Sequence, residues 1–227
     1  MATPFDAVST YFFAKDGNRP FLMRRAFTVS AELEMVVKTD AISFPGSASG
    51  LPAIEDILGR RFANDMENVH TFCLSRPTAA NRRHFPCYWL VGMSAKSNGP
   101  IRVGCGRYDW YFTADERCLA ERLIITIDVM HIFQETEIDA IMGWVSGLPY
   151  PWCTPNEVIA IMPRVEGLEP IEAYLSKSNR FHLTGSGLRF YCAGQDSGPA
   201  VDYGDVFLSR PASHVPAGLQ RNKGNYG

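Results

Sequence analysis

The spacing of hydrophobic positions switches between a helical and a strand period along the first 133 residues. Residues 4–14 place apolar side chains three and four positions apart, which predicts a helix. Residues 29–37 alternate apolar with polar positions, which predicts a half-buried strand with its acidic residues turned outward. In chain order the expected elements are helices at 4–14 and 21–27, a strand at 29–37, a helix at 51–62, and strands at 69–74, 85–93, 101–112 and 119–133.

This order of elements predicts an α+β fold in which a long curved antiparallel sheet wraps the N-terminal helices. The arrangement buries both the helical stripes and one face of the sheet, and it encloses a cystatin-like cone that is closed at one end. Gly104-Cys105-Gly106 lies inside an expected strand and predicts a β-bulge. No helix follows these glycines, so they do not indicate a phosphate-binding loop.

A mostly helical C-terminal extension follows the cone. Helices are expected at 134–145, 156–161 and 170–177, with a proline-rich turn at 148–155 and a short strand at 188–192. We therefore expect a cone domain at 1–133 and an extension at 134–195, which packs on the cone or on a partner subunit. Residues 196–227 are rich in Gly, Pro, Ser and Asp, which predicts a loosely ordered tail.

Composition narrows the classes of function. The 22 basic and 24 acidic side chains give a net charge of −2 without a basic cluster, which argues against a nucleic-acid partner. The sequence has neither an apolar run long enough to span a membrane nor a secretory signal, so we expect a cytoplasmic protein without a membrane partner. The six cysteines form no C-x-x-C pair, and no cofactor fingerprint is present. We expect neither a metal nor a cofactor.

Several segments together resemble the nuclear-transport-factor-2-like superfamily, which includes SnoaL-like cyclases, ketosteroid isomerases and scytalone dehydratases. They are Tyr11 on the first helix, Arg25-Ala26-Phe27, Leu33-Glu34-Met35, the helix start at 50–54, the strand at 106–112 and Ala120-Glu121-Arg122-Leu123. The resemblance covers residues 1–133 and implies a hydrophobic pocket inside the cone. It implies a cofactor-free dehydratase, isomerase or cyclase that acts on a small hydrophobic carbonyl or polycyclic compound.

The resemblance also suggests catalytic residues. Tyr11 matches the tyrosine that donates to the substrate oxygen in ketosteroid isomerases, and Tyr108 falls near their second hydrogen-bond donor. The position of their general base is Met35, so chemistry of that type lacks its carboxylate. By analogy with scytalone dehydratases, His70 is expected to face inward as the proton shuttle. The alternatives are a packing role for Tyr11 and a structural role for His70.

The remaining candidates are expected to line the ligand pocket. They are Met35, Trp89, Trp110, Phe112 and His131. A second interpretation is a non-catalytic module of the same fold that binds a small ligand or serves in assembly. The strands at 85–93 and 119–133 are apolar on both faces, so they require cover from the C-terminal helices, from a second subunit or from both. We therefore also expect a homodimer, and the extension could instead form a lid.

Overall fold

The computed structural model describes residues 1–183. Thr3 caps the first helix in a capping box with Asp6, and Pro4 occupies the first helical turn, so the N-terminal boundary is set by local chemistry. The helices are α1 (Pro4–Asp16), α2 (Leu51–Glu55), α3 (Phe62–Asp65), α4 (Ile138–Ser146), α5 (Pro155–Ala160) and α6 (Glu169–Leu183). The strands are β1 (Phe27–Val37), β2 (Ser47–Ser49), β3 (Met66–Cys73), β4 (His84–Ala95), β5 (Ile101–Phe112) and β6 (Ala120–Phe133). Short 3₁₀ segments cover Pro20–Arg25, Ala79–Asn81 and Glu135–Glu137, and a π-helical turn at Asp56–Arg61 joins α2 to α3.

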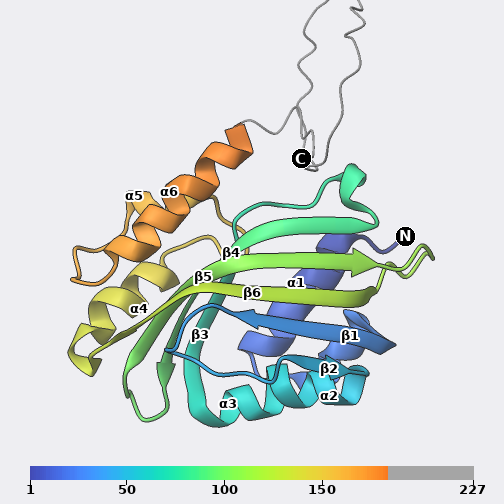
Figure 1. Ribbon diagram of the computed structural model, residues 1–227, viewed down its shortest axis with the longest axis horizontal. Coiled ribbons are helices and arrows are strands. Elements are labelled where there is room, and N and C mark those ends of the chain that lie inside the picture. The colour runs from blue at the N-terminus through green and yellow to red at the C-terminus, as the bar shows by residue number, and fades with distance from the viewer. Residues whose placement is uncertain (184–227) are drawn as a thin grey trace, which may run out of the picture. The chain divides into compact units, whose positions relative to one another are not determined.

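The six strands form one curved sheet in the order β2-β1-β6-β5-β4-β3 (Figure 1). All neighbouring strands are antiparallel except β1 and β6, which run parallel. A bulge in the β5–β6 pair falls at Cys105/Gly106, where the sequence predicts one. A Cβ atom on Gly106 would lie 1.9 Å from the Thr126 carbonyl oxygen, so this close approach requires glycine.

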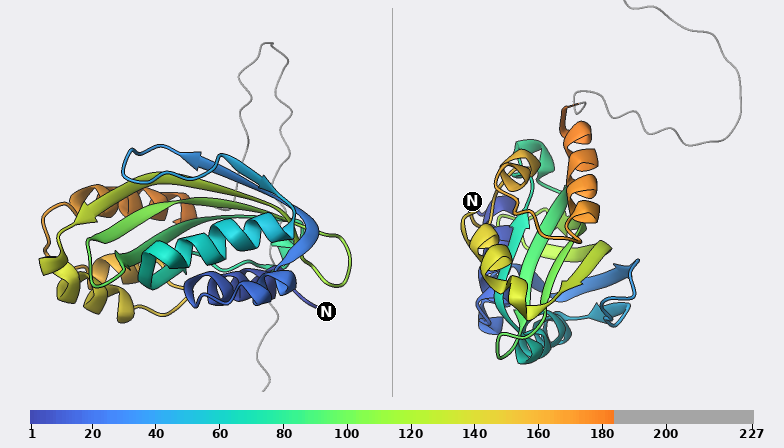
Figure 2. Two further views of the ribbon diagram at one scale, coloured as in Figure 1. Left: turned by 90° about the horizontal axis from the view of Figure 1, so that it is seen from below. Right: turned by 90° about the vertical axis from the view of Figure 1, so that its left-hand side faces the viewer.

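The sheet has a buried cluster on each face. On the concave face, α1 and the α2–α3 run pack together against the strands (Figure 2). On the opposite face, α4, α5 and α6 contribute Trp144, Val158 and Leu175 to a second cluster, which covers Phe72 and Leu90 of the sheet. This double cover explains why β3 to β6 carry apolar residues on both faces.

The predicted α+β class and the curved sheet around the N-terminal helices are confirmed. Two local boundaries differ from the prediction. The first helix was expected to end at residue 14, but α1 also includes Lys15 and Asp16. The stretch between the expected strand at 29–37 and the expected helix at 51–62 contains a further strand, β2. Its three small or polar residues carry no strand signal, and it pairs with β1 at the edge of the sheet.

Only part of the C-terminal segment for which we predicted elements lies within the described residues. Helices α4, α5 and α6 occupy the stretches where the sequence predicts helices. The expected strand at 188–192 and the tail at 196–227 lie outside the described residues, and the domain boundaries at 133 and 195 remain predictions. Among the described residues, no helix is long and apolar enough to cross a membrane.

Candidate functional site

A cavity of about 50 Å³ lies inside the cone between α1, the α2–α3 run and the sheet. Most of its wall is apolar and comes from β1, β4 and β6, with Ile42 and Phe44 contributed by the loop after β1. Four polar side chains interrupt this wall: Tyr11, Lys15, Thr71 and Tyr108. Since a water needs roughly 10–15 Å³ of such space, the cavity holds only a group of a few non-hydrogen atoms.

Lys15 is the charged group in the wall of this cavity. It sits in the last turn of α1, is 7% exposed, and its ammonium donates to Asp16 Oδ1 at 2.5 Å and to Thr71 Oγ1 at 2.8 Å. The same ammonium lies 4.8 Å from the centre of the Phe62 ring. A buried cation requires such partners, because an uncompensated charge away from water costs several kcal/mol.

The Asp16 carboxylate accepts hydrogen bonds from three residues. Besides the Lys15 ammonium, it accepts hydrogen bonds from the Thr71 backbone N–H at 2.7 Å and from the Thr71 hydroxyl at 2.9 Å. The Tyr150 hydroxyl, from the proline-rich turn after α4, donates to Asp16 Oδ2 at 3.2 Å. The carboxylate does not line the cavity itself, so it acts there by holding Lys15 in place.

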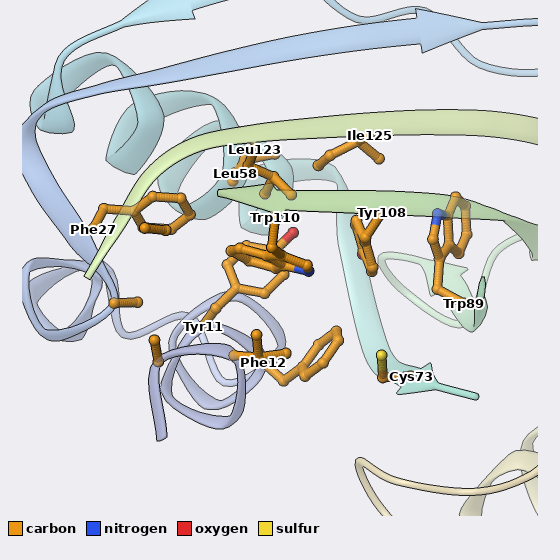
Figure 3. Close-up of a cluster of buried hydrophobic side chains, with 14 of the residues drawn as sticks. Tyr11, Phe12, Phe27, Leu58, Cys73, Trp89, Tyr108, Trp110, Leu123 and Ile125 are labelled. Atoms are coloured by element: carbon orange, nitrogen blue, oxygen red, sulfur yellow. The ribbon is translucent and has the colours of Figure 1, made fainter. Parts of the chain in front are cut away.

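Two tyrosine side chains, Tyr11 and Tyr108, also line this cavity. Tyr11 rises from α1 toward Trp110 and Tyr108 on β5 (Figure 3), and both tyrosine rings are buried. Burial raises the pKa of Tyr11 and that of Tyr108, so both remain protonated hydrogen-bond donors at neutral pH. The Tyr11 hydroxyl makes no hydrogen bond of ordinary geometry, although the Tyr108 phenol lies close enough to affect its pKa.

The two histidines in the prediction do not reach this cavity, so the expectation of an inward His70 is wrong. His70 lies on the outer face of β3, stacks near Phe72 and borders a hollow shared with α4. Its Nδ1 lies 3.1 Å from the Asn68 carbonyl oxygen. Thr71 is the neighbour that points inward. His131 also lies outside, where its ring packs against Gly167, whereas the adjacent Met130 lines the cavity.

The predicted pocket-lining residues separate into two groups. Met35 and Trp89 line the cavity. Trp110 and Phe112 are fully buried and stack on each other at 6.2 Å in the apolar core beside it, outside the cavity wall. The outward orientation expected for Glu34 is observed, since its carboxylate pairs with Arg122 on β6 at 2.9 Å.

Sequence reasoning missed Lys15, Asp16 and Thr71. A Lys-Asp pair followed by glycine is a common turn sequence, and only the packing of α1 against β3 shows that it is buried. The signal available in the sequence was the helical phase, since Lys15 follows Tyr11 by four positions and shares its face. No cluster of potential metal ligands is found within residues 1–183.

No family model and no curated protein matches the sequence. The chain is similar to a hypothetical protein from Catenulispora acidiphila with a ketosteroid isomerase-like fold, solved with trimethylamine, at 16% identity and a TM-score of 0.43 over 55% of this chain and 85% of that one. A nuclear-transport-factor-2-like protein from Salmonella enterica is 14% identical, with a TM-score of 0.44 over 55% and 88% of the two chains.

The curved sheet and the helices that cover it form an α+β fold to which these solved structures are similar. A pinacolase from Penicillium brevicompactum is also similar, at 11% identity and a TM-score of 0.44 over 55% of this chain and 85% of that one. At such identities the similarities concern the fold alone, and proteins of one fold perform many functions. The activity must therefore be argued from the cavity itself.

Proposed function

We propose that this chain is a cofactor-free enzyme of the isomerase or dehydratase kind, and that it moves a proton next to a carbonyl group held in the inner cavity. The observation that carries the proposal is the buried Lys15 ammonium, which faces an otherwise apolar cavity beside two protonated phenols. Polar groups placed in a dry site interact far more strongly with a developing charge than they do in water.

Each polar side chain has a role in this proposal. The Tyr11 and Tyr108 hydroxyls donate hydrogen bonds to the carbonyl oxygen and stabilise the enolate that forms there. The Lys15 nitrogen takes the proton from the carbon next to the carbonyl as one of its own protons passes to Asp16, and both transfers reverse when the product is protonated. Thr71 holds the pair in position.

The size of the inner cavity favours a carbonyl end group there over a whole polycyclic compound. The alternative is a binding module that holds the same kind of ligand without turnover. Cover of β3 to β5 comes from α4 to α6 and does not require a second subunit. The homodimer therefore remains a proposal, which sedimentation analysis of the purified full chain tests.

The catalytic proposal is tested without knowledge of the natural substrate. Removal of a proton next to a carbonyl in D₂O exchanges hydrogen for deuterium, and NMR follows this exchange in the small methyl ketone 2-pentanone. We expect the wild-type chain to accelerate exchange over buffer, and Lys15→Met to abolish the acceleration. Lys38→Met is the matched control, because Lys38 is an exposed lysine that pairs with Asp128 outside the cavity.

A loss of folding in Lys15→Met would leave its activity uninformative, so Tyr108→Phe is measured beside it. We expect this variant to fold and to accelerate exchange about 100-fold less than the wild-type chain, at the lower end of the range measured when one donor to an oxyanion is removed. Exchange at the buffer rate with the wild-type chain would favour the binding module. Equal rates in wild type, Lys15→Met and Tyr108→Phe would reject the roles given to these residues.

A further inference from the structure

A second chamber, of about 420 Å³, lies where the loop after β1, the α2–α3 run and the first residues of β3 and β5 come together, and we call this end of the cone its open end. It shares Ile42, Phe44 and Phe62 with the inner cavity, so these three side chains lie between the two spaces. The inner cavity is almost wholly apolar, whereas the outer chamber also contains charged side chains. A ligand that occupies both therefore has an apolar part and a charged part.

Arg102 indicates that the charged part of such a ligand is negative. It lies on β5 in the same alternation as Tyr108, six positions before it, and so faces the interior near the open end. Its Nε is buried without a hydrogen-bond partner, and its Nη1 contacts only the weak acceptor Met66 Sδ at 3.6 Å. A guanidinium has five N–H donors in a fork that matches a carboxylate.

Within the described residues, no carboxylate of the chamber pairs directly with Arg102. Arg61 lines the chamber, but its guanidinium pairs at 2.6 Å with Asp56, which does not line the chamber. Asp40 and Asp65 line the chamber, but within the described residues neither forms an ion pair with Arg102. The guanidinium is thus a partly buried cation with free donors, which is the feature expected of an anion-binding group.

The distance between Arg102 and Tyr108 along β5 determines how long a ligand must be to contact both. Six residues of extended chain separate Arg102 from Tyr108, which corresponds to about 20 Å along β5. Even after the reach of both side chains is subtracted, a ligand that contacts both ends needs an extended chain of several carbon atoms. A compact ketone of a few atoms can fill only the inner cavity.

From this geometry we propose that the ligand is an amphipathic carboxylate, namely an oxo acid with a medium-length apolar chain. Its carboxylate binds Arg102 at the open end, its chain passes Ile42, Phe44 and Phe62, and its carbonyl reaches Lys15 and the two phenols. The position of the carbonyl rests on the proposed function, whereas the binding of the carboxylate at Arg102 stands on the outer chamber alone.

Calorimetric titration of the full chain with octanoate and with octanamide tests this proposal. The two probes have the same chain length, and only octanoate carries a charge. We expect the wild-type chain to bind octanoate at least tenfold more tightly than octanamide, and Arg102→Gln to lose this preference while Arg102→Lys keeps part of it. Arg61→Gln, at the same chamber, keeps the full preference, and Asp65→Asn does not weaken octanoate binding.

Equal affinity of the wild-type chain for both probes, or no binding of octanoate, would overturn the proposal. So would an undiminished preference in Arg102→Gln. The result is separable from that of the exchange experiment. Octanoate binding that depends on Arg102, without exchange of 2-pentanone, retains the carboxylate site and rejects the catalytic role. Exchange without such binding does the reverse.

Discussion

The Tyr11 hydroxyl is expected to lower the stability of the fold. The side chain is fully buried, and its ring packs at 5.1 Å from Trp110, 5.3 Å from Phe12 and 5.9 Å from Phe27. Its oxygen, in contrast, has no hydrogen-bond partner of ordinary geometry. The variant Tyr11→Phe keeps the ring contacts and removes only the unpartnered group.

The expected magnitude follows from the cost of an unpartnered group. A buried donor without a partner costs about 1–3 kcal/mol, and the small void left by one oxygen atom returns part of that amount. We therefore expect Tyr11→Phe to raise the free energy of unfolding by about 1 kcal/mol. Tyr174→Phe is the matched control, because the Tyr174 hydroxyl donates to Asp128 at 2.7 Å, and its loss should lower stability by about 1–2 kcal/mol.

Urea unfolding with linear extrapolation measures both changes, provided that the dependence on urea concentration is the same in all three proteins. Opposite signs for the two variants support the reasoning. If Tyr11→Phe is less stable than the wild type by 1 kcal/mol or more, the hydroxyl is bonded, and the Tyr108 phenol is then its nearest candidate partner. A variant that gains stability and loses catalysed exchange would show that the unpartnered hydroxyl is kept for function.

Two further predictions concern glycine positions and pH. Gly106→Ala should destabilise the fold by more than about 3 kcal/mol, because its Cβ would meet a backbone oxygen at 1.9 Å. Gly143→Ala in α4, with open space around it, should stabilise the fold by about 0.5–1 kcal/mol. Thermal unfolding of both variants checks this, and equal effects would contradict it. Burial raises the pKa of both cavity phenols, so their contribution to stability is complete below pH 10 and is lost as the pH rises further, at up to about 1.4 kcal/mol per pH unit for each phenol. Urea unfolding between pH 9 and pH 11 measures this slope, and an unchanged slope in Tyr11→Phe would show that this phenol titrates normally.

The fold could be predicted from the sequence because its elements are set by local patterns. The alternation at residues 29–37 and the helical spacing at 4–14 each continue over several turns or repeats. The short strand β2 was missed because its pairing with β1 depends on the edge of the sheet and not on its own three residues. The strand order, including the parallel pair of β1 and β6, depends likewise on contacts between distant segments.

The candidate site was harder to predict, and the reason is the burial of both faces of the sheet. Alternation correctly groups His70 with Phe72, but it does not say which face points into the cone. In an ordinary half-exposed sheet the apolar face is the inner one. Here the apolar Phe72 belongs to the outer face under α4, and the polar Thr71 is the residue that faces the cavity.

The same double burial explains where chemistry can reside in this fold. Apolar side chains fill the inner cluster almost completely, so a polar group inside it must be held by other polar groups or remain unpartnered. Lys15 is of the first kind, since Asp16 and Thr71 hold it, while Tyr11 and Arg102 retain unpartnered donors. Each of these three side chains carries a cost of desolvation that an apolar residue of similar size would avoid. An amphipathic ligand that engages all three would remove that cost, and this is the physical reason to look for one.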